Sequence, residues 1–147
     1  MTRPLPGRVP AFAVLAALSV GALACASTPA RSTVGLDFNG LAEALRAGGA
    51  TVVTGEPVRQ PFFSVPGRIL VVNAEDVQIF EYDDASAAQA DAARVSQDGG
   101  SIGTTIISWM APPHFFRRDR LNAIYVGSNA SVLAALSSSL GPQFAGR

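Results

Sequence analysis

Few residues in this chain can carry acid–base chemistry. His114 is the only histidine, so any catalysis by an imidazole has to use it. A Ser101, His114 and Asp119 triad can be written, but their spacing gives no reason for the three side chains to meet. GGSIG at 99–103 has the G-x-S-x-G spacing of a hydrolase nucleophile elbow, which needs a strand before the serine and a helix after it. Here the sequence predicts a helix before Ser101 and a strand after it. We therefore predict no catalytic residues, and a small hydrolase using His114 is an alternative.

Metal, cofactor and nucleic-acid sites are not expected either. One histidine and one cysteine leave only carboxylates as further metal ligands. Walker A, G-x-G-x-x-G and CxxC patterns do not occur in the sequence. The 11 basic residues balance 11 acidic ones, so the chain lacks the positive field that attracts nucleic acid.

The one cysteine, Cys25, lies at the end of an apolar run. Arg3 and Arg8 precede this run, which extends from Val9 to Ala24. It is shorter than the roughly 20 residues of a membrane-spanning helix and suits the apolar region of a secretory leader. We expect residues 1–24 to be a signal peptide. An unpaired thiol is a reactive liability in an exported protein, and acylation removes it.

The sequence Ala22-Leu23-Ala24-Cys25 resembles the lipobox of bacterial lipoproteins, although that family prefers leucine at the position of Ala22. The resemblance implies that Cys25 carries diacylglycerol after cleavage and attaches the chain to a membrane. Because Ala26 follows the cysteine, it implies the outer membrane if the organism has one. An ordinary A-x-A cleavage site, giving a secreted soluble protein, and an uncleaved segment with an unmodified cysteine are alternatives.

Beyond the leader we expect a lipidated cysteine with a flexible tether over 25–35 and a single α+β domain over 36–144. The order α-β-β-β-α-β-β-α predicts a predominantly antiparallel sheet with the helices packed on one face. The apolar periodicity and the Gly, Asp and Asn punctuation predict helices over 37–48, 85–97 and 130–140, and strands over 50–54, 67–72, 77–82, 104–110 and 121–126.

One stretch, HFFRRDR at 114–120, is a candidate binding surface. Its arginines, Arg117, Arg118 and Arg120, are predicted to crowd a hairpin tip beside His114, Phe115 and Phe116. Arginine binds phosphate or carboxylate, and exposed aromatic rings pack on a partner or on lipid headgroups. The alternative is a solvated turn whose arginines extend into water while the phenylalanines face the core.

Residues 40–146 also resemble small bacterial lipoproteins or secreted proteins of uncharacterised function, in QPFFSVPGRILVVNAEDVQIFEY, in the IGTT, PPHFFRR and YVG stretches, and in the closing LGPQFAG. This resemblance implies no activity, ligand or catalytic residue. We expect a lipid-anchored cell-envelope protein, a non-enzymatic module that binds an envelope protein or an anionic envelope component near the membrane. The other alternative is a small-molecule binding module with its ligand between sheet and helices.

Overall fold

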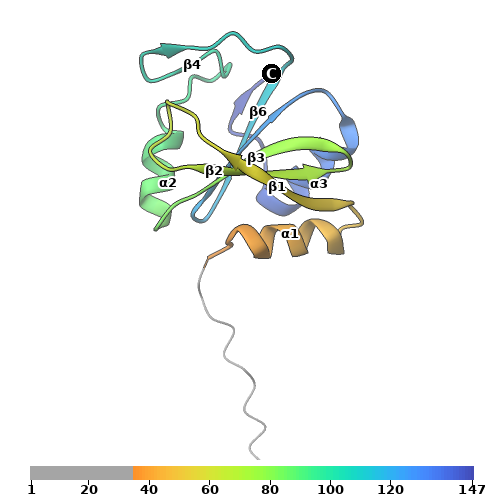
Figure 1. The fold of residues 1–147 in the computed structure, drawn as a ribbon. Helices are drawn as coiled ribbons and strands as arrows, with labels where there is room; N and C mark the ends of the chain where they lie inside the picture. The colour runs from red at the N-terminus through yellow and green to blue at the C-terminus, as the bar shows by residue number, and fades with distance from the viewer. Residues whose placement is uncertain (1–34) are drawn as a thin grey trace, which may run out of the picture. The chain divides into compact units, whose positions relative to one another are not determined.

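The computed structural model describes residues 35–147, which form an α+β domain of three helices around a six-stranded antiparallel sheet (Figure 1). The helices are α1 (Phe38–Ala47), α2 (Ala85–Ala92) and α3 (Ala130–Leu140). Across the sheet the strands are β1 (Val52–Val58), β2 (Gly67–Val72), β3 (Glu75–Glu81), β7 (Leu121–Val126), β6 (Pro113–Arg118) and β8 (Ala145–Gly146). The expected signal peptide and Cys25 lie outside the described residues.

The predicted fold class and order of elements are confirmed. Two hairpins, β2–β3 and β6–β7, form the middle of the sheet, and the pairing of β3 with β7 joins them. The sheet also takes in β8, which pairs with β6 beyond the expected domain end at residue 144. No helix among residues 35–147 is long and apolar enough to cross a membrane.

Each helix begins at a side chain that the sequence marks as a cap. Asp37, Asp84 and Asn129 accept a hydrogen bond from a backbone N–H of the first turn, at 2.7, 2.8 and 3.0 Å. Such a bond satisfies one of the donors that a helix start leaves free. Helix α3 ends at Gly141, whose φ of +90° favours glycine. These local signals place the three helix starts and the end of α3 correctly, but α2 ends at Ala92 instead of the predicted residue 97, because Val95 forms a bridge with Ile102.

The helices lie on both faces of the sheet. Leu121, Ala123 and Tyr125 of β7 point into the core under α1 and α3. Asn122 points the other way and donates a hydrogen bond of 2.9 Å to the carbonyl of Ala88 in α2. Because side chains alternate along a strand, α2 covers the opposite face. The expectation that all helices share one face holds for α1 and α3 but not for α2.

The predicted strand over 104–110 is not part of the main sheet. Only β5 (Thr105–Ile106) pairs there, with β4 (Ser101–Ile102), in a separate two-stranded hairpin. The place in the main sheet belongs to β6, the segment we expected to be an exposed turn. Since helices or loops cover β6 on both faces, its side chains are buried without alternation.

Candidate functional site

The aromatic residues of the predicted binding surface are part of the core. Phe115 and Phe116 are each 1% exposed and point to opposite faces of the sheet, Phe116 toward α1 and α3 and Phe115 toward the other core. They are not available to a partner. The alternative in which the phenylalanines face the core therefore describes them correctly.

His114 is buried, with both ring nitrogens in hydrogen bonds. Nε2 lies 2.9 Å from the carbonyl oxygen of Gly127, and Nδ1 lies 2.7 Å from Oε1 of Gln143. The backbone carbonyl of Gly127 only accepts, so Nε2 donates to it, and Nδ1 pairs with the side-chain amide of Gln143. The ring stacks on Tyr125 at 5.9 Å between centroids. Asp119 lies just past the far end of β6, about 16 Å along an extended strand. His114 thus has no nitrogen free for a substrate, and the triad is not assembled.

Tyr125 joins His114 to a second group of polar side chains. Its hydroxyl donates to Oε2 of Glu75 at 2.9 Å and accepts from the backbone N–H of Asn129 at 3.0 Å. Burial, together with the Glu75 carboxylate, raises the pKa of Tyr125. This arrangement fastens the start of α3 to the start of β3, and it is a structural network.

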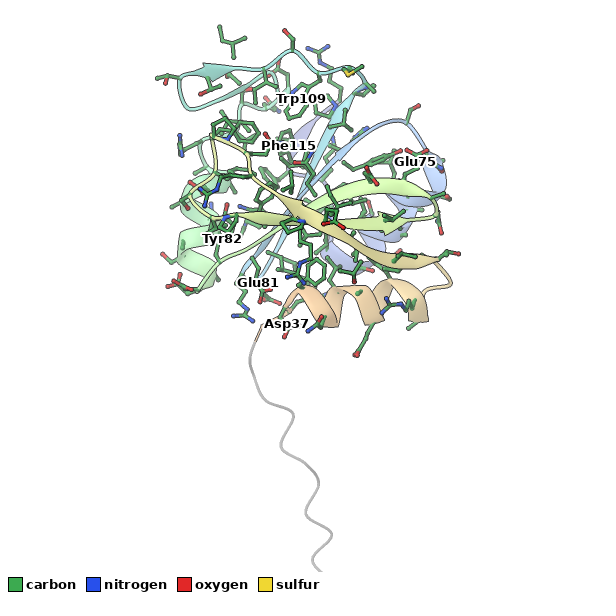
Figure 2. The ribbon with its side chains drawn as sticks, in the orientation of Figure 1. Asp37, Glu75, Glu81, Tyr82, Trp109 and Phe115 are labelled. Carbon is green, nitrogen blue, oxygen red and sulfur yellow. The ribbon has the colours of Figure 1, made fainter. Side chains whose placement is uncertain are left out.

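Arg118 and Arg120 at the β6–β7 tip both contact neighbouring groups. Arg120 Nη2 lies 2.6 Å from Oε1 of Glu81 and 3.9 Å from Oδ2 of Asp37. Figure 2 shows Glu81 and Asp37 at the same end of the domain. Arg118 Nη1 donates to the carbonyl of Ser139 in α3 at 2.7 Å. The tip therefore fastens helices α1 and α3.

Asp119, between these arginines, holds the point where the described chain begins. Its Oδ2 accepts a hydrogen bond of 2.7 Å from the backbone N–H of Leu36. Asp119 has a φ of +50°, in the left-handed region that aspartate tolerates better than most residues. The hairpin tip and the entry of the chain into the domain therefore lie together. Arg117 is half-buried, and its side chain has no hydrogen bond or ion pair with the described residues.

Arg118 also lines a groove of about 600 Å³ between α1 and α3. Small residues form most of its walls, among them Ala44, Gly48, Ala134 and Ser138. Arg118 is the only charged residue in the wall, and its side chain is 54% exposed. The groove therefore presents a mostly apolar surface with one cation, which suits an occupant that carries a negative group.

A buried carboxylate that we did not single out from the sequence forms the densest polar cluster. Asp91 in α2 is 6% exposed. Its Oδ2 accepts from the backbone N–H and hydroxyl of Ser64, both at 2.7 Å, and from the Tyr82 hydroxyl at 3.0 Å. Arg94 Nη1 lies 3.2 Å from Oδ1. The amino-acid sequence shows only one of these contacts in advance, through the i,i+3 spacing of Asp91 and Arg94 on a helix.

The chemistry of this cluster is structural. Burial acts to raise the pKa of Asp91, but the hydrogen bonds from Ser64, Tyr82 and Arg94 outweigh it and hold the pKa below 3.8. Burial raises the pKa of Tyr82, which stays a neutral donor. A carboxylate with a lowered pKa and several donors is a poor general base. The cluster fastens the loop over 59–66 to α2.

Residues 35–147 contain no group of three His, Cys, Asp or Glu side chains close enough to hold a metal ion. Comparisons with protein-family models, with curated proteins and with solved structures found no match to this chain. The site must therefore be judged on its own geometry.

Proposed function

We propose that the chain is an exported cell-envelope protein, held to a membrane by lipid on Cys25, whose body is a non-enzymatic binding module. The leader over 1–24 and the lipobox-like Ala22–Cys25 support the anchor. In an organism with two membranes, the residue after the cysteine, Ala26, favours the outer one. The alternative is a secreted soluble protein cleaved at the A-x-A site.

The groove between α1 and α3 carries the binding part of this proposal. Its wall contains one cation, Arg118, and no carboxylate, although Asp119 Oδ2 lies 3.9 Å from Arg118 Nε outside the wall. We propose that it takes an anionic group of an envelope protein or other envelope component. Its place beside the tip that holds Leu36 keeps it near the start of the domain.

A small-molecule ligand is the second candidate. The groove volume of about 600 Å³ falls within the roughly 300–1,000 Å³ of typical ligand sites. A hydrolase using His114 has no comparable support, because both of its ring nitrogens are occupied. Amide chemical-shift changes confined to α1 and α3 in a screen of carboxylates and phosphates would favour the small ligand over a protein.

The anchor is tested by growing the native cell with an alkyne-tagged fatty acid. We expect the wild-type chain to be labelled and Cys25→Ser to be unlabelled, with an intact mass that starts at Cys25 plus diacylglycerol. An unmodified N-terminus at residue 25, 26 or 27 contradicts the anchor and favours the secreted alternative.

The groove is tested with a photocrosslinking amino acid at Ala134, which is exposed within it. We expect one defined crosslinked partner, or a bound ligand mass, that is lost in Arg118→Gln. Ala90 on α2 is also exposed and serves as the matched control on the opposite face. The same product from both positions, or a product that survives Arg118→Gln, contradicts the proposed site.

A further inference from the structure

We propose that the loop over 103–111, which includes β5, inserts into the interface of a lipid bilayer and gives the body its own membrane contact. Ile106 is 86% exposed and Met110 is 102% exposed, so both side chains stand free in water. Moving such side chains from water into an apolar environment is favourable. This proposal goes beyond the lipid on Cys25, since the body makes this contact itself.

The loop carries no charge that would oppose insertion. The sequence contains no Asp, Glu, Lys or Arg between Asp98 and Arg117. Charged side chains are the most costly groups to move into a bilayer, whereas the Thr and Ser hydroxyls of this loop suit the interface. The side chains of Ile106 and Met110 can therefore enter the headgroup region without moving a charged residue of the loop into it.

Its backbone is also prepared for a less aqueous environment. Ser101 pairs with Ile106 and Ile102 with Thr105, and the N–H of Ile107 donates to the carbonyl of Gly100 at 3.0 Å. Paired backbone groups avoid much of the cost that free ones incur in lipid. The backbone around Ile106 is thus paired, whereas Met110 lies past the hairpin, in the irregular segment over 107–111.

Trp109 fixes the base of the loop. Its Nε1 donates to the carbonyl of Gly99 at 2.7 Å, and its ring makes edge contacts with Phe62 and Phe115 at 6.4 and 5.9 Å between centroids. Tryptophan is enriched at membrane interfaces. The half-buried indole therefore holds Ile106 and Met110 at a fixed distance from the core.

The area of the exposed prongs favours a bilayer over a protein partner or a second copy. A specific protein interface buries about 1,200–2,000 Å² and needs a complementary surface. Here two large side chains protrude separately from a short loop, and the other exposed large hydrophobics among the described residues are only Val53 and Phe144. A bilayer accepts protruding side chains without a matching pocket.

The loop and the entry of the chain lie at opposite ends of the domain. The loop leads into Pro113 at the start of β6, whereas Asp119, which binds Leu36, follows its last residue. Figure 2 shows Trp109 and Asp37 at these two ends. The contact that the loop makes is therefore separate from any contact made where the chain enters the domain.

The single tryptophan of the chain makes the test direct. The full chain is mixed with vesicles of phosphatidylethanolamine and phosphatidylglycerol whose acyl chains carry bromine, and the fluorescence of Trp109 is measured on the floated fraction. We expect bromolipid to roughly halve the emission, as for an interfacial tryptophan. The double variant Ile106→Ser with Met110→Ser should float by its leader or lipid but lose the quenching. Val53→Ser, an exposed apolar site on β1, should quench like the wild type.

A wild-type chain that floats without quenching overturns the loop proposal and leaves the lipid anchor intact, and a protein partner then becomes the occupant. A wild-type chain that does not float overturns the loop proposal as well. Quenching together with an unacylated Cys25 overturns the anchor and supports the loop. Quenching that persists in the double serine variant also contradicts insertion through these prongs.

Discussion

Asp91 stabilises the domain only while it is ionised. Its folded pKa lies below the 3.8 of an unperturbed aspartate, so its contribution is complete above the unfolded value and is lost as the pH falls through the folded value. We expect Asp91→Asn to lower the free energy of unfolding by about 1–3 kcal/mol at pH 7, because the surrounding donors lose a charged acceptor.

The pH dependence separates this effect from general damage. In urea unfolding, the gap between wild type and Asp91→Asn should shrink as the pH falls below 3.8, because the wild type loses its ionised acceptor there. Asp76, an exposed carboxylate, supplies the matched control Asp76→Asn. A gap that stays constant from pH 7 to pH 2.5 would show that the Asp91 charge is not the stabilising factor.

Gly127 is required by the Tyr125 side chain rather than by its own backbone angle. A Cβ at this position would collide with the hydroxyl oxygen and with the adjacent ring carbons of Tyr125. We expect Gly127→Ala to lower the free energy of unfolding by about 1–3 kcal/mol through overpacking. In a Tyr125→Leu background, which removes the ring as well as the hydroxyl, the same change should cost clearly less, as a thermal unfolding cycle of the four proteins would measure. Equal costs in both backgrounds would place the strain elsewhere.

At the scale of the elements, the β6–β7 tip fixes the N-terminal end of the domain through the hydrogen bond between Asp119 and Leu36. Asp119→Ala removes the acceptor of the Leu36 N–H and puts alanine at a φ of +50°. We expect a loss of about 1–2 kcal/mol and faster amide exchange at Leu36 and in the first turn of α1. Asp119→Asn keeps an acceptor and tolerates this φ, so it should retain most of the protection. Unchanged amide exchange at Leu36 in the alanine variant would contradict this role of Asp119.

The helix starts and the end of α3 were predictable because their causes are local, whereas the end of α2 was not. Asp37, Asp84, Asn129 and Gly141 act within one turn of their own position, so a single sequence reveals them. The strand predicted over 104–110 was wrong, because a short apolar segment has the same sequence pattern whether it is buried in a sheet or exposed on a loop. Which segment joins the main sheet depends on which one pairs with β7. β6 does so along its whole length, from Pro113 to Arg118.

The candidate site was less predictable than the fold. Spacing along the chain placed Arg118 and Arg120 near a tip, but it did not show that Glu81 and Ser139 occupy them. Nor did it reveal Asp91, whose partners Ser64 and Tyr82 come from other segments. Contacts between distant segments depend on which face each element covers, and the face that α2 covers was predicted wrongly.

At the scale of the whole molecule, the last residues complete the hydrophobic core on the α2 face of the sheet, which includes Phe115 and Ala145. Ala145 is 4% exposed, and the N–H groups of Gly146 and Arg147 donate to Gln97 and Pro113 at 2.9 and 3.0 Å. We expect a chain that ends at Phe144 to lose about 2–3 kcal/mol, from these hydrogen bonds and the exposed edge of β6. Calorimetry on both chains measures it. Arg147→Ala keeps the backbone and should stay within about 0.5 kcal/mol of wild type. A truncated chain as stable as wild type would contradict the role of β8.

The central position of β3 has a consequence for how the protein is made. β2 reaches β3 through a tight turn, but the other neighbour of β3, β7, begins only at Leu121. A ribosome adds roughly 5–20 residues each second, so the nascent chain holds β3 with one bare edge for several seconds before β7 arrives. Unpaired strand edges are templates for aggregation. Protection by chaperones should therefore matter most in that interval, and a pause in synthesis after Glu81 should lower the yield of folded protein more than a pause after Val126.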